Sequence, residues 1–576
     1  MEPAAVAGRV GIVLAALVSL VALARLGRPR EALATIRRRL LFGLPWATLT
    51  VSALVVAVYL FVQGGWSHWR RPLVVAFRSW TYLYPLGMLA AAFAHAGPGH
   101  LLGNVAGTLA LGSLAEYAVG HFPRERGATT FASWRTNPYV RALVVLPGAV
   151  VAGGVALSAV AVGPVVGFSG VVYALGGFAV AYYPIRTVVA LTVSDGLRLA
   201  YRALRSPVVV AGGRATYVTP WWANVAVQGH AVGFVVGVAA AVVLQRRRGD
   251  AGPTGGRLWV GATLFVVAQT LWAVYWYRGG STFVLYRGVG LAAALLLAVL
   301  VAVAVGAAER PLWPSVWDDL DVDAGADAAT DGGYPDRARR WLARRWPPTR
   351  ARVAFLALVV VVAGVAGPAV PLNLVTTGDD DLPNESLSVR DYEVTYAEGV
   401  ENGMVSVVEG GPLDGATSVN TSGVIVRSSD RHVWTTAASK GRLAFAGTLR
   451  VVVGGVGWRR TVVATRQGWS AVGGPAAYRV QLSVGDRSVT PFRSAPAQAD
   501  PRPAGRNVSV AAGPGGFLLE VETANGSVQA PLPAKNESLT LSNVTFVRHD
   551  DSVVAVTTDG TRVTVFERES YGGNGG

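Results

Sequence analysis

The sequence predicts an α-helical polytopic membrane protein that ends in an all-β domain. Of its 576 residues, 52% are hydrophobic and only 15% are charged, a balance typical of membrane proteins. Apolar segments of about 20 residues, long enough to cross a bilayer as helices, recur through residues 1–375. Residues 376–576 instead contain short runs rich in Val and Thr, separated by Gly, Pro, Asn and Asp, and this pattern indicates strands.

The composition also limits the chemistry. The chain has no cysteine, which excludes disulfides, thiolate nucleophiles and thiolate metal sites. The net charge is +16, but the surplus lies almost wholly in residues 1–375, where basic residues cluster at the ends of apolar runs. Such clusters are typical of topology signals, so we expect no nucleic-acid partner. We also expect no cofactor.

The apolar segments predict about ten spans. The first has no Lys or Arg before Arg9 and a strongly basic flank behind it, so we interpret it as a retained helix and not as a signal peptide. The segment at about 187–204 is a poorer candidate because three charged residues interrupt it; it either faces protein or water or lies partly in the interface. The expected spans are about 9–27, 44–64, 100–119, 142–161, 169–184, 187–204, 229–245, 257–276, 286–308 and 353–373.

Two patterns predict the orientation. Placing the four Arg-rich clusters inside puts both termini outside. Independently, all six N-x-[ST] sequons follow the last expected span, as an outer tail that can be glycosylated would require. We therefore expect a multi-pass glycoprotein of the cell membrane with an extracytoplasmic C-terminal domain. The sequon asparagines are Asn384, Asn420, Asn507, Asn525, Asn536 and Asn543.

Four regions follow from these expectations. Residues 1–43 hold an extra N-terminal transmembrane helix and a basic cytoplasmic linker, and residues 44–250 hold a six-helix core. Residues 251–375 add three spans and a charged cytoplasmic loop at 309–352, which is acidic first and basic afterwards. Residues 376–576 form the extracytoplasmic β-rich domain.

Polar residues within spans are costly, so each one requires a reason. Ser169, in GFSG, lies at the outer end of a span that runs inward. Gly167 and Gly170 leave no side chains beside it, so a backbone or a substrate can approach closely. Tight packing of a Gly- and Ser-rich helix end would explain the same pattern without any chemistry.

His230, in QGHAVGFVVGVAA, lies at the same depth in another inward-running span. Gly233 and Gly237 form a G-x-x-x-G stripe, which lets this helix pack very closely on a neighbour. Close packing would bring the Ser169 hydroxyl within hydrogen-bond reach of the imidazole, as an activated serine nucleophile needs. An interhelical hydrogen bond or a proton relay is the alternative role for such a histidine.

A third polar group lies in HAGPGHLLGN, at the outer end of another inward-running span. His100 and Asn104 are four residues apart and share a helix face. Both can donate hydrogen bonds to a developing oxyanion, together with the backbone N–H of Ser169. No third His or carboxylate stands at a suitable spacing, so we expect no metal site here. The three groups together supply a nucleophile, a base and an oxyanion hole at one membrane face.

This set resembles the rhomboid intramembrane serine proteases. The resemblance rests on H-x-x-x-N at His100 and Asn104, G-F-S-G at Ser169 and G-H-x-x-G-x-x-x-G at His230, in the same order and on the second, fourth and sixth spans of a six-helix core. It covers residues 44–245. Glu116, near the inner end of the second core span, and Tyr173, one turn below the serine, are further matches.

The resemblance implies a serine-type endopeptidase that cleaves transmembrane protein substrates near the outer membrane face. Ser169 would attack the scissile carbonyl, and His230 would take its proton and later protonate the leaving amine. His100, Asn104 and the Ser169 N–H would hold the oxyanion, and Tyr173 would stack on the imidazole. Substrate helices must unwind locally, so small and helix-breaking residues are expected at the cleavage site. Its partners would be these substrates and the lipid bilayer, and the C-terminal domain would bind substrate ectodomains or cell-surface material.

The sequence departs from the family in one loop. Where the family often has Trp-Arg, this chain has Trp80 followed by Thr81. The loop before the last core span contains Trp221 and Trp222, which we expect to cap the substrate entrance.

Two other functions remain open. A catalytically silent relative would bind transmembrane helices and pass them on, although the intact Ser169 and His230 argue against it. A transporter would usually show inverted repeats and polar residues near the midplane, whereas the polar residues here lie at one face.

Overall fold

The structure, a computed structural model, falls into two compact units. The first comprises Met1–Gly212, Trp221–Trp276 and Leu285–Leu374, and the second comprises Gly213–Pro220, Tyr277–Val284 and Val375–Gly576. Most of the expected loop at 309–352 and the sequon residue Asn525 lie outside the described residues. The described residues are 3–26, 29–122, 128–209, 217–278, 282–306, 349–374, 382–402, 420–524 and 526–572.

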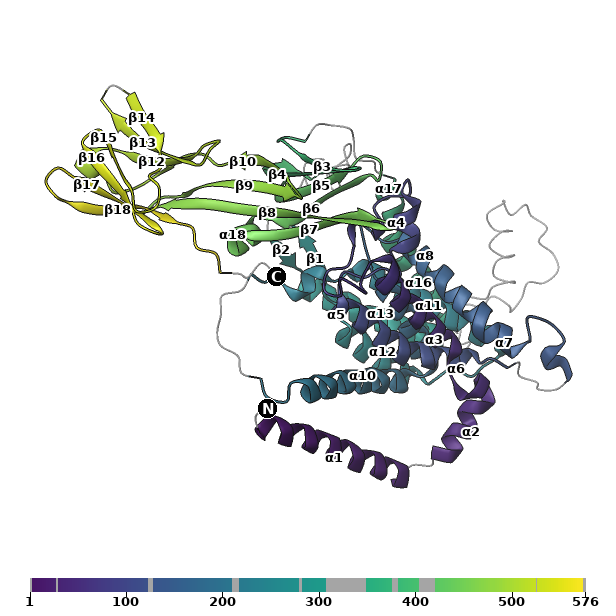
Figure 1. Cartoon of the computed structure of the whole chain (residues 1–576). Coiled ribbons are helices and arrows are strands. Elements are labelled where there is room, and N and C mark those ends of the chain that lie inside the picture. The colour runs from purple at the N-terminus through teal and green to yellow at the C-terminus, as the bar shows by residue number, and fades with distance from the viewer. Residues whose placement is uncertain are drawn as a thin grey trace, which may run out of the picture. The chain divides into compact units, whose positions relative to one another are not determined.

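The first unit is built from helices (Figure 1). Two of its long helices continue through π-helical turns: α3 into Val58–Val62, and α5 through Thr108–Gly112 into α6. A third π turn, Arg141–Val145, joins α7 to α8. The helices are α1 (Pro3–Leu26), α2 (Pro29–Arg39), α3 (Trp46–Ala57), α4 (Pro85–Ala90), α5 (Pro98–Gly107), α6 (Ser113–Val119), α7 (Pro138–Val140), α8 (Leu146–Ala159), α9 (Ser169–Tyr182), α10 (Pro184–Arg205), α11 (Val227–Arg248), α12 (Gly255–Ala268), α13 (Arg287–Gly306), α16 (Arg350–Ala366) and α17 (Ala369–Leu372).

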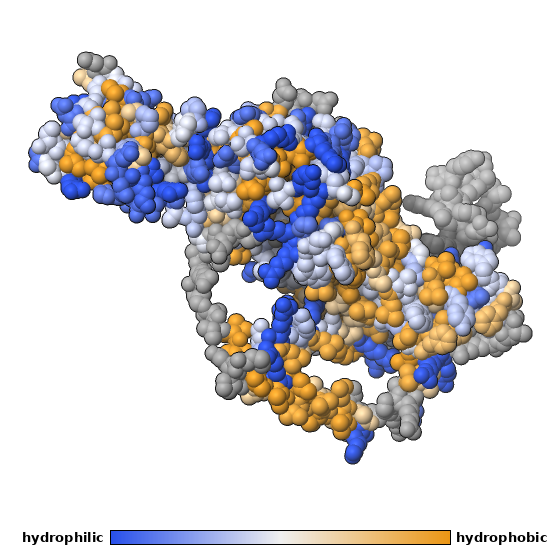
Figure 2. All heavy atoms as spheres, in the orientation of Figure 1, coloured by the Kyte–Doolittle hydropathy of each residue, from blue (hydrophilic) through white to orange (hydrophobic). Residues whose placement is uncertain are grey.

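These helices confirm a multi-pass integral membrane protein. Among the described residues, five helical stretches are long and apolar enough to cross a bilayer, and three shorter apolar ones accompany them. Hydrophobic residues cover much of the visible surface of the helices, where a membrane protein meets lipid (Figure 2). The five are Ala4–Ala22, Pro138–Ala159, Val227–Arg248, Arg287–Gly306 and Arg350–Leu372; the shorter three are Trp46–Val62, Ser169–Tyr182 and Gly255–Ala268.

The charged segment expected at about 187–204 forms an unbroken helix, α10. It is not among the stretches apolar enough to span by composition. Asp195 and Arg198, one turn apart on its exposed side, form an ion pair at 2.5 Å. This pairing lowers the cost of placing two charges beside a membrane.

Helices α9 and α11 pack with their backbones in contact. A Cβ added to Gly233 would lie 2.2 Å from the carbonyl oxygen of Gly170, and one added to Gly237 would lie 1.8 Å from that of Ala174. Gly177 of α9 meets a carbonyl of α11 in the same way, at 2.0 Å. No side chain fits at these distances, so the glycines set the separation of the two helices.

A buried carboxylate joins α3 to α6. Glu116 accepts hydrogen bonds from the backbone N–H groups of Ala47 and Thr48, at 2.9 and 2.8 Å, and from the Thr48 hydroxyl. His121 Nε2 donates to the same carboxylate at 2.6 Å, and its Nδ1 accepts the backbone N–H of Leu41. Glu116 therefore caps α3, where a helix N-terminus favours negative charge.

The second unit carries an all-β domain, as the sequence predicts. Its strands pair antiparallel in sheets of eight, four and four strands. The strands are β3 (Leu387–Val389), β4 (Tyr392–Glu401), β5 (Asn420–Ser428), β6 (Val433–Ser439), β7 (Thr448–Gly455), β8 (Trp458–Ala471), β9 (Ala476–Val484), β10 (Arg487–Arg493), β11 (Ala497–Gln498), β12 (Val508–Ala512), β13 (Phe517–Thr523), β14 (Gly526–Pro531), β15 (Ser538–Leu541), β16 (Val544–Arg548), β17 (Ser552–Thr557) and β18 (Arg562–Arg568); α18 (Lys440–Ala446) follows β6, and β1 (Tyr275–Tyr277) pairs with β2 (Phe283–Leu285) between α12 and α13.

The eight-stranded sheet has the order β10-β9-β8-β18-β17-β16-β15, with β7 paired to β8. Strand β8 is the longest, with 14 residues, and its buried positions mostly alternate along the strand. Its beginning pairs with β7 and its end with β18, through partners such as Trp469 and Arg568. The last strand of the chain is therefore an interior strand of this sheet.

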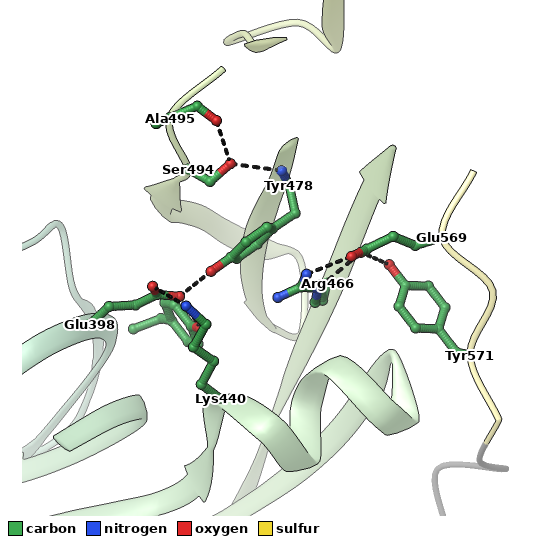
Figure 3. A network of polar contacts seen from close by, with 9 residues as sticks. Glu398, Lys440, Arg466, Tyr478, Ser494, Ala495, Glu569 and Tyr571 are labelled. Atoms are coloured by element: carbon green, nitrogen blue, oxygen red, sulfur yellow. Dashed lines mark hydrogen bonds and ion pairs between the residues drawn. The ribbon is translucent and has the colours of Figure 1, made fainter. Parts of the chain in front are cut away.

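A polar network ties the β domain together (Figure 3). Glu398 accepts hydrogen bonds from the hydroxyls of Tyr396 and Tyr478 and pairs with Lys440 at 2.6 Å. The Arg466 guanidinium lies 3.4 Å from the centre of the Tyr478 ring.

The same arginine binds the C-terminal segment. Arg466 donates two hydrogen bonds to Glu569, at 2.9 and 2.5 Å, and the hydroxyl of Tyr571 donates to this carboxylate. A bidentate guanidinium–carboxylate pair fixes both distance and orientation. The segment after β18 is thus attached to β8.

We predict that the β domain loses stability in acid through Glu398. Burial alone would raise the pKa of this carboxyl, but hydrogen bonds from Lys440, Tyr478 and Tyr396 outweigh it and hold the pKa below its usual value. The stabilisation is therefore complete above the unfolded pKa, about 4.3, and is lost as the pH falls through the lower folded pKa. Unfolding of the β domain can be monitored by limited proteolysis of the full chain at increasing temperature. The unfolding temperature should fall less on acidification in Glu398→Gln than in the unmodified protein. The exposed Glu385→Gln is the control, and equal acid sensitivity in both variants would contradict the assignment.

We also predict that Gly237→Ala destabilises the helical unit. The added methyl must push α9 and α11 apart, and such overpacking costs about 1–3 kcal/mol. In detergent, the unfolding temperature should fall relative to the unmodified chain. The matched control is Gly364→Ala on α16, where an added Cβ meets nothing within 4 Å. A Gly237→Ala protein as stable as this control would show that the helices can separate freely.

Candidate active site

Ser169 and His230 lie in hydrogen-bond contact. Ser169 is the first residue of α9 and His230 lies in the first turn of α11. The close approach of the two helices places His230 Nε2 2.8 Å from Ser169 Oγ. For Nε2 to accept the serine proton, the imidazole must be neutral with its proton on Nδ1. In the described part of the chain, that buried Nδ1 has no hydrogen-bond partner, so no carboxylate orients the ring.

Tyr173 orients the imidazole by stacking. Its ring lies one helical turn below Ser169 and parallel to the His230 ring, with centroids 4.1 Å apart and an interplanar angle of 10°. The hydroxyl of Tyr173 donates to the carbonyl of Gln269, just beyond α12. The Tyr173 ring is thus held by the stack at its face and by the hydrogen bond at its hydroxyl.

Asn104 is oriented by His95, a residue that the sequence motifs did not indicate as part of the site. Asn104 Nδ2 lies 3.0 Å from His95 Nε2, and His95 Nδ1 lies 3.1 Å from the Phe93 carbonyl. An amide nitrogen only donates, so Nε2 must accept and Nδ1 must carry the proton. Gln63 holds His95 in turn, by accepting its backbone N–H at 2.7 Å and donating to its carbonyl at 2.9 Å. The signal in the sequence was a second histidine, five residues before His100.

Gly167 brings the oxyanion candidates to the serine loop. Its φ of +127° lies in a region that favours glycine. A Cβ there would lie 2.4 Å from the His100 ring and 3.5 Å from Asn104 Nδ2. The loop that leads into Ser169 is therefore in contact with both side chains. Gly170 has more room, since its added Cβ would come no closer than 3.8 Å to any neighbour.

The loop that contains Trp80 and Thr81, where the sequence departs from the family pattern, is hydrogen-bonded to the end of α17. The Thr81 hydroxyl donates to the carbonyl of Asn373, after α17, at 2.9 Å. Asn373 Nδ2 donates in turn to the carbonyls of Ala159 and Ala161, at the C-terminal end of α8. Thr81 therefore joins this loop to the end of α17, beyond the range expected for the six-helix core. Arg78 contacts the same region through the carbonyl of Pro164, at 3.5 Å.

The two loop tryptophans pack on residues that follow α12. Trp221 lies edge-on to Trp272 with centroids 6.3 Å apart, and Trp222 lies 5.6 Å from Tyr275. Trp221 is 60% exposed. Their role as a cap over the entrance stays a prediction.

The site offers acid–base and nucleophilic chemistry. Among the described residues, no group of three or more His, Asp or Glu is placed to hold a metal ion. A large apolar cavity of about 520 Å³ lies between α3, α8, α9, α11 and α16. Its lining is mostly apolar, and the polar side chains in it are Thr48, Thr108 and Glu116.

Comparison with known proteins identifies one domain. Residues 80–247 match the family model described as Rhomboid domain. The matched range contains Ser169, His230, His100 and Asn104. It excludes α3, α12 and everything that follows. No curated protein and no solved structure matches the chain.

We predict that Gly167→Ala disturbs this site more than its size suggests. The methyl both strains the backbone at a positive φ and displaces the His100 ring, so the unfolding temperature should fall by the equivalent of about 1–3 kcal/mol. The reactivity of His100 toward diethylpyrocarbonate should also change. Gly97→Ala is the matched control, because Gly97 is extended and its Cβ meets nothing within 4 Å. If the two variants have the same unfolding temperature and the same His100 reactivity, the loop at Gly167 accommodates the added methyl without loss of stability.

Proposed function

We propose, from the premise that the chain belongs to the rhomboid family, that it is an intramembrane serine endopeptidase acting through Ser169 and His230. Its substrates would be transmembrane proteins, cut near the outer membrane face. The observation that carries the proposal is the 2.8 Å contact between His230 Nε2 and Ser169 Oγ, because a serine hydroxyl is a weak nucleophile until a base accepts its proton.

The reaction would proceed in two steps. His230 Nε2 takes the proton from Ser169 Oγ as the oxygen attacks the scissile carbonyl, and then gives it to the leaving amine. Water repeats the sequence on the acyl-enzyme and releases the new carboxylate. The stack with Tyr173 supports this role, because the same ring position must serve as base and then as acid.

The oxyanion would lie at the N-terminus of α9. The Ser169 N–H is there, and the helix dipole favours negative charge at that end. His95 occupies one N–H of the Asn104 amide and holds the group in place, which leaves the second N–H for the substrate. His100, against Gly167, is the third donor.

The boundaries expected from the sequence remain proposals, as does the outer location of the β domain in a cell membrane. If the domain lies outside, its exposed sequons would be glycosylated first: Asn420, Asn536 and Asn543. The other two described sequons are already engaged. Asn384 Nδ2 donates to the Tyr396 carbonyl and Asn507 Nδ2 to Glu522. We further propose that the domain binds substrate ectodomains or cell-surface material.

The proposal predicts cleavage that depends on the Ser169–His230 pair. Purified full-length protein in detergent should cut a model transmembrane substrate, and mass spectrometry should place the cut near its outer end. Ser169→Ala should abolish cleavage, His230→Ala should lower kcat by about 100- to 10,000-fold, and Asn104→Ala by about 100- to 1,000-fold. The buried Ser158→Ala on α8 is the matched control.

A fluorophosphonate that labels Ser169 provides an independent readout. Cleavage that persists in Ser169→Ala would contradict the proposal. If the unmodified protein neither cleaves nor becomes labelled but retains the substrate helix on purification, the silent helix-binding function is the correct one.

A further inference from the structure

We propose that α12, a helix beyond the matched domain, positions His230 through Tyr173. The anchoring group is the main-chain carbonyl of Gln269, which accepts the Tyr173 hydroxyl. The inference rests on the proposed function, in which His230 is the base. It assigns Tyr173 and Gln269 as positioning residues, since neither touches the reacting atoms.

Tyr173 is held on three sides. One face stacks on His230, with centroids 4.1 Å apart, and Phe265 of α12 meets the ring edge-on, with centroids 6.0 Å apart at 87°. The Gln269 carbonyl receives the hydroxyl. The side chain is only 8% exposed, so the ring has little freedom to turn.

The geometry of the helix end explains why this carbonyl is available. The N–H of Thr270 donates to Val267 O at 3.2 Å and that of Leu271 to Val266 O at 3.0 Å. These two bonds form a Schellman cap, which satisfies the carbonyls of Val266 and Val267. Gln269 lies at the cap position itself, where the carbonyl has no intrahelical donor. It therefore points out of the helix and accepts the tyrosine.

The cap depends on an unusual residue. Thr270 has a φ of +57°, in the left-handed region where glycine is the normal choice. A β-branched residue is a rare outlier there. The strain is sustained because Leu271 and Val266, which flank the turn, are both buried. The direction of the Gln269 carbonyl thus rests on one strained turn.

Helix α12 is fixed firmly enough to serve as an anchor. A Cβ on Gly176 of α9 would lie 2.5 Å from the Phe265 ring, and one on Gly261 would lie 2.4 Å from Pro184 at the start of α10. Phe265 also stacks on Phe234 of α11, with centroids 5.0 Å apart. The helix is therefore packed against α9, α10 and α11 at once.

The anchor matters because, in the part of the chain that the structure describes, His230 Nδ1 has no hydrogen-bond partner that could orient the imidazole. In other serine hydrolases, a carboxylate at this nitrogen fixes the ring. Here the ring orientation depends on the stack, and the stack depends on where α12 holds the Tyr173 hydroxyl.

Four variants of the full-length protein test the anchor. Tyr173→Phe removes the hydroxyl and keeps the ring. Thr270→Pro forbids a positive φ and so redirects the Gln269 carbonyl. Thr270→Gly keeps the turn and removes only the Thr270 side chain, which also hydrogen-bonds Tyr173, so it should preserve most of the anchor. Tyr182→Phe, also on α9, removes a buried hydroxyl that has no partner among the described residues and is the matched control.

Two readouts apply to every variant. Tyr173→Phe and Thr270→Pro should lower kcat by about two- to tenfold with KM unchanged, which is the value of one hydrogen bond, and should shift the pH profile of kcat. The rate at which diethylpyrocarbonate modifies His230 should rise by a similar factor, because a loosened ring is more accessible. Tyr182→Phe should match the unmodified protein in both readouts, and Thr270→Gly should lie closer to the unmodified protein than Thr270→Pro does.

The outcomes separate this inference from the proposed function. If the unmodified chain cleaves nothing, the proposed function fails, but a faster modification of His230 in Tyr173→Phe and Thr270→Pro still supports the anchor. Unchanged modification in Tyr173→Phe overturns it whether or not the chain is active. If Thr270→Pro does not fold, Tyr173→Phe decides alone, because that change removes a single oxygen from an otherwise identical ring.

Discussion

Because α9 and α11 carry glycine where they cross, their backbones touch, and this contact fixes the rest of the site. A single methyl at Gly237 would need to occupy the space of the Ala174 carbonyl oxygen. The separation is therefore set by main-chain atoms, which cannot change rotamer. Ser169 and His230 lie at the N-terminal ends of these two helices, and their 2.8 Å contact follows from the helix crossing. Large apolar side chains would have held the helices together but kept these two residues too far apart.

Two polar networks fix further parts of the helical unit. Glu116 and His121 join α3 to α6, and Gln63 and His95 hold Asn104. Each of these five side chains has at least one hydrogen-bond partner, which lowers the cost of placing it within a membrane. The helices after the core add further contacts. Those from Thr81 to Asn373 and from Tyr173 to Gln269 join residues of the matched domain to segments outside it.

The sequence predicts the parts of the structure that depend on side-chain type and spacing. Hydropathy gave the membrane class, short Val-rich runs gave the β domain, and glycine spacing indicated the close approach of two helices. It did not single out His95, because its partners Gln63 and Asn104 lie 32 and nine residues away and a lone histidine carries no sign of them. Nor could it find the Gln269 carbonyl, since every residue has one. The turn at Thr270 could not be predicted either, because only a glycine at that position would have indicated a left-handed helix cap.

The strand order of the β domain sets a condition on its folding. Strand β18 lies inside the eight-stranded sheet, between β8 and β17. Strands β15, β16 and β17 connect to β8 only through β18, whereas β7 and β9 pair with β8 directly. Until β18 docks, Trp469, Ser470 and Ala471 at the end of β8 lack their partners on that side. The pairing of β18 with β8, between segments about 100 residues apart, is therefore the step that joins the two parts of this sheet.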